Sequence, residues 1–301
     1  MRKILLFFLC LAQFGIAQQV NVLSLEKIKV TENGGYFYPK FSPANDYILL
    51  SQINYKGLVK YSFTDQNLKV INEDPGAGYD VQISNDGETI LYKKIELINK
   101  LRHNSLITQD LSSNEKTTLV LPTRENVAGK LINSSPVYVK GKKMIKNSSV
   151  AKNISPTVIT IEDKKMVLYK NGIRKELTPN GNDKSYIWPS ISPDGIHIVY
   201  TVAGKGTFVA NIDGTNIKSF GKLSAPKWAG NKYIVGMDDI DDGQKLISST
   251  IKIVSIDGKI KEKLNTPEGV NAMYPSASND GSKIAFNTEK GEVYIMNVEL
   301  K

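Results

Sequence analysis

Hydrophobic and polar residues alternate in short runs along most of the chain, and Gly, Pro, Asn or Asp bounds each run. The runs at residues 196–201 and 283–287 are rich in β-branched and aromatic residues, a composition that favours strands. No run shows the periodicity of an amphipathic helix. The pattern therefore predicts an all-β protein built of short antiparallel strands.

One tight-turn motif recurs along the chain and predicts a repeat fold. It is clearest at residues 189–195, which read Pro-Ser-Ile-Ser-Pro-Asp-Gly, and worn copies stand at residues 38–43, 81–87 and 274–281. The spacing averages about 47 residues, which suits a four-stranded propeller blade. The turns that follow the first strand of each unit are centred near Asn45, Asp86 and Gly87, Gly141, Asp194 and Gly195, Gly230 and Asn231, and Asp280 and Gly281.

A second series of turns supports the same period. These turns lie at residues 64–67, 112–114, 171–172, 213–214 and 257–258, and several are the Asn-Gly or Asp-Gly pairs that a two-residue hairpin demands. The sixth unit ends after its third strand, at residues 292–298, and an N-terminal strand at residues 25–30 is expected to supply the fourth. The count predicts six blades closed by pairing of the two chain ends. A count of five or seven blades remains an alternative, because 61 residues separate Asp110 from Asn171 and the turn motif is poorly matched between them.

The N-terminus predicts an export signal. Arg2 and Lys3 precede an apolar run at residues 4–14, and the small residues Gly15 and Ala17 follow. The run is too short for a membrane helix, which needs about 20 apolar residues. We therefore expect residues 1–17 to be removed and residues 18–301 to form a single domain without a thiol, since the one cysteine, Cys10, lies in the signal.

Charge narrows the choice of partners only slightly. The formal net charge is +9, or +7 without Arg2 and Lys3, and no long run has a single sign. The densest basic group has two interpretations. Its lysines either discourage pairing at an exposed strand edge or attract an acidic glycan or anionic lipid. A nucleic-acid partner is not expected in an exported protein. The densest basic group is Lys140, Lys142, Lys143 and Lys146.

The repeat resembles a known family. Residues 189–200 followed by residues 208–214 are similar to the WD-like repeat of TolB-type six-bladed propellers, and the resemblance spans most of the mature chain. It implies an all-β six-bladed propeller of four-stranded antiparallel blades. TolB itself is periplasmic, carries an extra N-terminal domain and associates with the peptidoglycan-associated lipoprotein Pal. About 18 residues separate the signal from the first motif here, so that extra domain is not expected.

Catalytic constellations are sparse in the sequence. The aspartates of the repeat motif are interpreted as turn residues that bond the following backbone. No Gly-x-Ser-x-Gly elbow is present. The two histidines, His103 in an expected loop and His197 in an expected strand, are 94 positions apart. The sequence therefore gives little support for acid–base catalysis by histidine. We therefore expect a non-enzymatic protein that needs no cofactor.

One acidic cluster is the weak candidate for a cation site. It falls between the second and third strands of one blade, and closely spaced carboxylates suit calcium, which takes six to eight oxygen ligands. The spacing lacks the alternation of an EF-hand loop, so a solvated hairpin loop is the favoured interpretation and no metal is expected. The cluster comprises Asp238, Asp239, Asp241 and Asp242.

Aromatic residues recur just before each first strand and form the candidate binding site. In a propeller these positions approach the mouth of the central channel, where they either pack between blades or line a binding funnel. The candidates are Tyr36, Tyr38, Tyr79, Asp80, Tyr186, Trp188, Met273 and Tyr274.

These features together predict a monomeric binding propeller, periplasmic or secreted, in a Gram-negative bacterium. Its expected partner is a protein or peptide of the cell envelope that docks at the channel face. A carbohydrate-binding or carbohydrate-active propeller is the alternative, in which Asp80 and Asp238 would face one cavity. A scaffold subunit of an envelope assembly is the third possibility.

Overall fold

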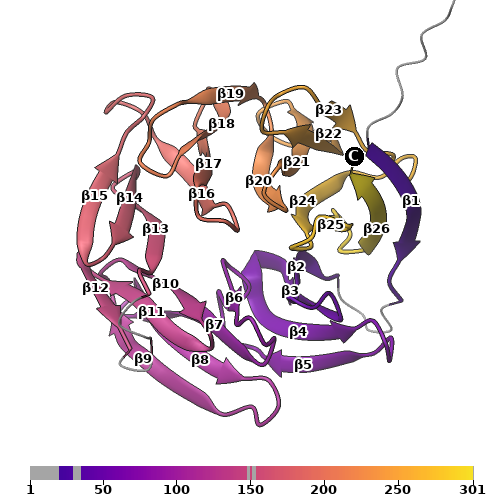
Figure 1. Cartoon of the computed structure of the whole chain (residues 1–301). Helices are drawn as coiled ribbons and strands as arrows, with labels where there is room; N and C mark the ends of the chain where they lie inside the picture. Colours follow the sequence, from indigo (N-terminus) through magenta and orange to yellow (C-terminus); the bar gives the residue numbers. More distant parts are fainter. Residues whose placement is uncertain (1–19, 30–34, 148–149, 151–153, 301) are drawn as a thin grey trace, which may run out of the picture.

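The computed structural model describes residues 20–29, 35–147, 150 and 154–300. Seven antiparallel sheets follow one another around a ring, and the strands of each are neighbours in the chain except where the ring closes (Figure 1). Among the described residues the only helical element is the 3-10 turn η1 (Ile53–Tyr55). The expectation of an all-β propeller without helices is therefore confirmed.

Each sheet is one blade, and the blades are numbered here from the first motif. Blade 1 holds β2 (Phe37–Phe41), β3 (Tyr47–Gln52), β4 (Lys56–Ser62) and β5 (Leu68–Asn72); blade 2 holds β6 (Gln82–Ile83), β7 (Thr89–Ile98), β8 (Leu101–Asp110) and β9 (Lys116–Thr123); blade 3 holds β10 (Val127–Ile132), β11 (Ser135–Lys140) and β12 (Lys143–Lys146); blade 4 holds β13 (Thr157–Glu162), β14 (Lys165–Lys170) and β15 (Ile173–Leu177). Blade 5 holds β16 (Tyr186–Ile191), β17 (His197–Val202), β18 (Gly206–Asn211) and β19 (Lys218–Gly221); blade 6 holds β20 (Ser224–Ala229), β21 (Tyr233–Asp241), β22 (Leu246–Ser255) and β23 (Lys261–Lys263); blade 7 holds β24 (Ala272–Ala277), β25 (Lys283–Thr288), β26 (Val293–Leu300) and β1 (Val20–Lys27).

The six-blade count is wrong, and the error lies between Asp110 and Asn171. That stretch holds most of two three-stranded sheets rather than one four-stranded sheet. Two of their hairpin turns, Asn133-Ser134 and Asp163-Lys164, have positive φ at both residues, as two-residue hairpins require. Because neither turn contains glycine, a search for Asn-Gly and Asp-Gly pairs passes over both.

Among the described residues, the two short blades together have two strands fewer than two of the four-stranded blades. We call the end of the ring where the inner strands β2, β6, β16, β20 and β24 begin the entry face, and the opposite end the turn face. The turn after β13 lies at the entry face, since the Tyr186 amide at the start of β16 donates to Lys164 O (2.8 Å). The innermost strand of blade 4 therefore runs opposite to those of the other blades. In the described residues, blade 3 lacks an outer strand and blade 4 lacks the usual inner one.

The ring closes through the N-terminal strand. β1 pairs antiparallel with β26, from Val20 opposite Leu300 to Lys27 opposite Tyr294, and so forms the outer strand of blade 7. Figure 1 shows β1 at the outer edge beside β26. The expected closure is confirmed, although the strand begins at Val20, five residues before the expected start, and Val30 lies outside the described residues.

Core side chains fill the spaces between neighbouring blades. One cluster joins blades 6 and 7 with β1, a second joins blades 7 and 1, and a third joins blades 1 and 2. A further cluster joins the two three-stranded blades and includes the fully buried Tyr169 and the nearly buried Val150. Since each blade buries its faces only against its neighbours, blade order and ring closure are both needed to complete the core.

The repeat motif is a turn device at the turn face, as the sequence indicates. In the best copy, the buried Ser192 hydroxyl donates to Asp194 Oδ1 (2.5 Å) and accepts the His197 amide (2.9 Å), while Gly195 has φ of 75°. Ser84 with Asp86, and Ser278 with Asp280, repeat the arrangement. These aspartates hold tight turns by bonding nearby donors.

These turns predict a loss of stability in acid. The Ser192 hydroxyl, with the Ile196 amide, holds the pKa of Asp194 below its ordinary value. A depressed pKa stabilises the fold above the unfolded value of about 4, and the contribution disappears as the pH falls through the folded value. The same holds for Asp86, mainly through Ser134 and Ser84. Urea midpoints should therefore fall between pH 6 and pH 3, and by less in Ser192→Ala, whereas parallel pH profiles for the variant and the parent would contradict this role.

Candidate functional site

A residue with a left-handed backbone recurs at the inner strands of five blades, and in four of them it forms a bulge. Tyr38, Asp80, Trp188, Ala225 and Tyr274 all have φ between 49° and 58°, a region that side-chain-bearing residues rarely adopt. In blades 1, 5, 6 and 7 the pairing with the second strand shifts at this point. Such bulges re-aim side chains and gather at functional sites. The inner strands of blades 3 and 4 pair without a shift, so the bulged blades form one arc of the ring.

Proline explains how the sheet tolerates the bulge. In the four blades where the register shifts, the left-handed residue is followed at once by proline, as in Tyr38-Pro39 and Tyr274-Pro275. Proline has no amide hydrogen, so no backbone donor is left without a partner when this position leaves the hydrogen-bond ladder. The Tyr-Pro and Trp-Pro pairs in the sequence are therefore the mark of this bulge.

Four tyrosines meet at the entry face in an unbroken row, which we call the tyrosine row. Tyr38 stacks on Tyr55 with centroids 3.8 Å apart and tilts against Tyr274 at 4.8 Å. Tyr55 in turn meets Tyr79 edge-on at 5.2 Å. The row crosses from blade 7 through blade 1 to the start of blade 2. Aromatic pairs in these arrangements attract one another beyond simple burial, so the rings hold one another in place.

A buried side chain from the next blade fixes the centre of the row. The Tyr38 amide donates to Oδ1 of Asn287 (3.0 Å), and Asn287 is fully buried in β25. Its Nδ2 donates to Thr288 O (3.1 Å), which orients the amide. The left-handed backbone at Tyr38 is therefore held from blade 7.

Replacement of Asn287 should loosen the row. Asn287→Ala leaves the Tyr38 amide without its acceptor, at an expected cost of about 1–3 kcal/mol in the free energy of unfolding. Urea unfolding measures that cost. Asn297→Ala, which loses a bond to Ser24 on the outer strand of the same blade, is the matched control. Equal effects of both changes would contradict a specific role for Asn287.

The structure divides the sequence-predicted aromatic residues into two groups. Tyr36 and Tyr186 are buried and pack between strands, so they support the mouth without lining it. Tyr79 and Trp188 are the most accessible, at 44% and 38% exposure. Tyr38, Met273 and Tyr274 are half-buried, and Asp80 is exposed beside Tyr79.

Tyr55 belongs to the row but escapes sequence reasoning. It lies in η1, within the hairpin that joins β3 to β4, and has φ of 59°. The connection from blade 1 to blade 2 packs against it, since the Gly78 amide donates to Tyr55 O (3.1 Å). A rule that takes aromatic residues just before each inner strand cannot find a residue contributed by a hairpin.

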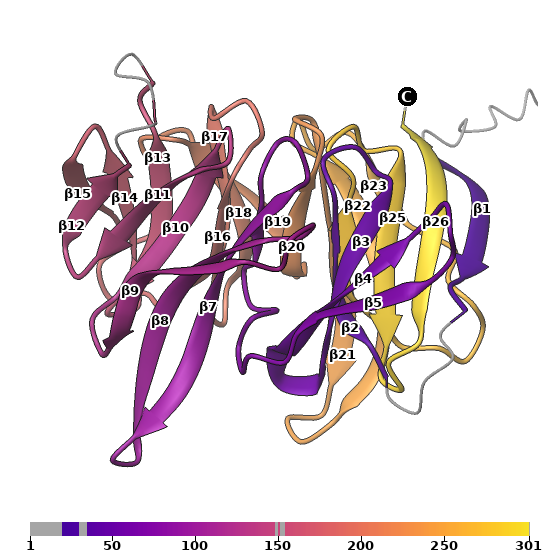
Figure 2. The same ribbon diagram turned by 90° about the horizontal axis from the view of Figure 1, so that it is seen from below.

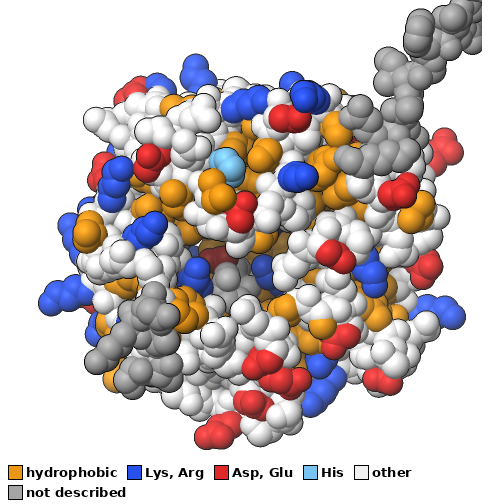
Figure 3. Space-filling model, in the orientation of Figure 1, with side chains coloured by type: hydrophobic (Ala, Val, Ile, Leu, Met, Phe, Trp, Pro, Cys, Tyr) orange, Lys and Arg blue, Asp and Glu red, His pale blue; other side chains and the backbone are white. Residues whose placement is uncertain are grey.

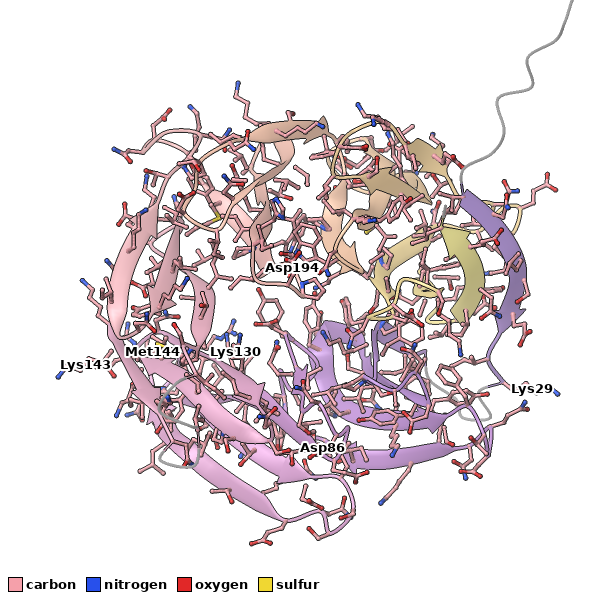
Figure 4. The ribbon with its side chains drawn as sticks, viewed as in Figure 1. Lys29, Asp86, Lys130, Lys143, Met144 and Asp194 are labelled. Atoms are coloured by element: carbon pink, nitrogen blue, oxygen red, sulfur yellow. The ribbon has the colours of Figure 1, made fainter. Side chains whose placement is uncertain are left out.

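Lysines converge inside the ring. Burial, followed by the nearby Lys227, lowers the pKa of Lys40, and Asp80 acts in the opposite direction. Burial also lowers the pKa of Lys130, which Figure 4 places on the inner side of the ring. Figure 3 views the ring from the turn face and shows a hollow at its centre with Lys or Arg side chains at the edge. Lysines of blades 1, 3 and 6 therefore lie at the channel, with Asp80 as a nearby carboxylate.

The acidic cluster of blade 6 does not converge on one point. Asp238 pairs with Lys263 (2.9 Å), whereas Asp239 and Asp241 both lie near Lys222 (3.6 and 3.4 Å). Asp242 accepts the amides of its own turn. No group of three or more potential metal ligands occurs within the described residues. The carboxylates are thus distributed between lysines and a hairpin turn.

The remaining charged candidates lie away from the row. His103 lies in β8 rather than in the expected loop, and His197 lies in β17 as expected. Gly141 turns β11 into β12, so it is not the turn after an inner strand. Of the basic group around it, Lys143 lies on the edge strand β12, and Figure 4 shows it pointing away from the ring. That position suits protection of an open edge.

Two long hairpins rise from the entry face. β7 with β8, and β21 with β22, extend beyond the other strands at one end of the ring (Figure 2). The first hairpin exposes Leu97, Ile98 and Leu101 near its tip, and Leu97 is 74% exposed. The second exposes Ile240 and Ile247. Exposed apolar side chains therefore lie near the tips of both hairpins.

Comparison with known proteins relates the chain to solved propellers. No family model matches the sequence, and no curated protein matches it. TolB from Acinetobacter baumannii superposes with a TM-score of 0.55 at 16% identity, covering 82% of this chain and 58% of that one. The Cps50 (Swd1) β-propeller domain of Myceliophteria thermophila gives 0.58 at 9% identity, covering 92% and 100%. An oligogalacturonate lyase in complex with manganese gives 0.50 at 14% identity, covering 89% and 79%.

The chain has a TolB-like β-propeller fold. The resemblance seen in the repeat motif is therefore confirmed at the level of fold, with seven blades in place of six. This TolB-like propeller spans less than two thirds of the length of the Acinetobacter TolB chain. Its described residues contain no helix with the length and hydropathy of a membrane span.

Proposed function

We propose that this chain is an exported binding propeller that docks a protein or peptide partner of the cell envelope at its entry face. The observation that carries the proposal is the tyrosine row, in which Tyr38, Tyr55 and Tyr274 are held with left-handed backbones. Strain of this kind persists only where the surrounding structure enforces it. Rigid, half-exposed tyrosines are typical anchors of protein interfaces.

The hairpin tips support a macromolecular partner. Leu97, Ile98 and Leu101 are exposed near the tip of the β7–β8 hairpin, which extends beyond the other strands at the entry face (Figure 2). A flat partner would meet these tips before it reached the row, so an extended segment that enters between the hairpins fits better. Main-chain groups and side chains of such a segment would then contact the tyrosines.

The positions of Asp80 and Asp238 do not favour the carbohydrate alternative, which needs both carboxylates at one cavity. Asp80 lies at the mouth beside Tyr79, whereas Asp238 lies in β21 and pairs with Lys263 of the outer strand β23. The pair that general acid and base chemistry would require therefore does not face one cavity. The entry face offers aromatic and apolar contacts instead, which favours a protein partner.

Export belongs to the proposal and rests on the sequence. The basic pair Arg2-Lys3, the apolar run and the small residues before position 18 all fall in residues 1–19, which lie outside the described residues. A periplasmic or secreted monomer in a Gram-negative bacterium, with residues 1–17 removed, is the form that we propose meets the partner.

Affinity purification from native envelope extracts tests the proposal. The bait is the full chain, compared with the triple variant Tyr38→Ala, Tyr55→Ala and Tyr274→Ala. We expect the partner proteins recovered by the parent to fall at least tenfold with the variant, because each anchor contributes about 1–2 kcal/mol or more. Leu121→Ala, on the outer strand β9 and 74% exposed, is the control. Undiminished recovery with a folded triple variant would overturn the proposal.

A further inference from the structure

A cavity of about 670 Å³ opens beside the end of the tyrosine row, where blades 2, 3 and 4 meet. Its walls come from β7 and β8, from the connection between blades 2 and 3, and from the turns after β11 and β13. The side chains that matter to its chemistry are Tyr79, Lys93, Arg102, Arg124, Lys142 and Glu162.

The irregular pair of blades creates this cavity. Because the innermost strand of blade 4 runs in reverse, its end at Glu162 and Asp163 reaches the entry face. Between blades 3 and 4 the entry face carries the two-residue turn that joins β13 to β14, where the other blades have a connection from an outer strand to the next inner strand. The cavity therefore belongs to the part of the ring where the repeat is broken.

Positive charge dominates the lining. Four cations of the lining form no ion pair within the described residues: Lys93, Arg102, Arg124 and Lys142. Of the carboxylates in the lining, Glu125 and Asp163 also form no ion pair there. Arg102 Nε bonds the Asn104 amide oxygen (3.3 Å), which leaves its terminal nitrogens available.

The third carboxylate of the lining, Glu162, is already neutralised. Arg174 Nη2 donates to its Oε2 (2.6 Å), and the Tyr169 hydroxyl and Asn126 Nδ2 donate to its Oε1 (2.6 and 3.2 Å). The Glu162 carboxylate therefore adds little net charge to the cavity, and four cations face two free carboxylates.

Tyr79 makes the cavity continuous with the tyrosine row. One side of Tyr79 meets Tyr55, and Lys93 Nζ lies 5.7 Å from the ring centroid. Burial lowers the pKa of Lys93, with Arg102 acting in the same direction and Asp80 against it. An anion that entered the cavity would relieve the repulsion between Lys93 and Arg102.

We infer that this cavity binds the acidic side chains of an extended peptide segment whose apolar residues lie on the tyrosine row. The inference rests on the proposed function and adds the chemistry of the partner: carboxylates next to aromatic or aliphatic residues. Arg102 and Arg124 each present a planar guanidinium, the group best suited to bidentate carboxylate recognition. Leu101, exposed beside Arg102, offers an apolar contact that a peptide can use.

Binding of capped hexaglutamate to the full chain tests the inference directly, by isothermal calorimetry at low salt. Hexaglutamine is the uncharged probe and trigalacturonate the acidic saccharide probe. The variant Arg102→Gln with Arg124→Gln should weaken hexaglutamate binding at least tenfold. The matched control removes two charges elsewhere, Lys252→Gln with Lys261→Gln on β22 and β23, and should leave binding within twofold.

The outcomes separate this inference from the proposed function. Binding of hexaglutamate that disappears in the arginine variant and weakens at high salt supports the inference, whether or not envelope partners are recovered by the tyrosine row. Binding of trigalacturonate without hexaglutamate would overturn it in favour of an acidic saccharide. Equal loss in both double variants, or no binding of either acidic probe, would also overturn it, while partner capture through the tyrosines would still stand.

Discussion

A chain that begins at residue 28, and so lacks the closing strand β1, should fail to form a stable ring. We expect its melting temperature to fall by more than about 10 °C, or the protein to aggregate. The reference is a chain that begins at Gln18. Differential scanning calorimetry and size-exclusion chromatography measure the two effects.

The expected loss follows from what β1 contributes to blade 7. Val20 is fully buried in the cluster that joins blades 6 and 7, and Val22 and Leu25 pack against that cluster. Each such side chain contributes about 1.5–3 kcal/mol when fully buried, and each ladder hydrogen bond adds about 1 kcal/mol. Domains are stable by only about 5–15 kcal/mol, so the loss is comparable with the whole.

Removal of β1 also exposes an edge. β26 would present unpaired amides and carbonyls between Tyr294 and Leu300, which is a template for pairing with another chain. Addition of a synthetic peptide of residues 18–29 should then restore the monomer. An unchanged melting temperature in the shortened chain would contradict the closing role of β1.

The closure and the boundaries of the regular blades could be predicted because local residues encode them. The Ser-Pro-Asp-Gly turn is formed mainly by local contacts: the Ser192 hydroxyl donates to Asp194 and Gly195 takes the left-handed conformation, while Asn231 of the next blade adds a bond to the Asp194 amide. The unpaired third strand of the last unit likewise points to a partner at the other chain end. Such signals survive in a single sequence.

The blade count failed where no characteristic residue type marks the turns. The turns Asn133-Ser134 and Asp163-Lys164 use non-glycine residues in the left-handed region, and the surrounding ladders enforce that conformation. The loss of an outer strand and of an inner strand also leaves the spacing of the remaining turns ambiguous. Tertiary packing, not turn chemistry, decides that region.

The site was predicted in part for a similar reason. Tyr38 and Tyr274 lie near the start of the inner strands β2 and β24, and Tyr79 lies just before β6, so their place at the mouth follows from the repeat. Tyr55 comes from a hairpin, and Lys93 with Arg102 comes from strands of unusual length. Their meeting depends on how far β7 and β8 extend past the ring, which no motif in the sequence records.

Tyr169→Ala should cause the largest loss of stability of any single substitution between the two irregular blades. The Tyr169 side chain is fully buried in the cluster shared by blades 3 and 4, among Val139, Val158 and Val167. Removal of such a ring costs about 3–5 kcal/mol through lost burial and the cavity left behind. Urea unfolding should therefore show a clear shift of the midpoint.

The hydroxyl of Tyr169 adds a separate, smaller contribution. Burial, with the Tyr169–Glu162 hydrogen bond, raises the pKa of Tyr169 to about 12, so the hydroxyl remains a donor to Glu162 at neutral pH. Tyr169→Phe keeps the ring and removes this one bond, while Arg174 still neutralises Glu162 and Asn126 still donates to it. We expect a loss of about 1–2 kcal/mol for Tyr169→Phe.

The comparison of the two substitutions tests whether blades 3 and 4 form one packed unit. If they share a core, Tyr169→Ala should unfold the whole ring in a single transition at lower urea, and Tyr169→Phe should give a small shift of the same transition. A separate early transition in Tyr169→Ala, with the remaining blades unfolding at the parent midpoint, would show that the irregular pair is an independent unit. In that event the cavity beside Tyr79 would open with it, and hexaglutamate binding would be lost at the early transition.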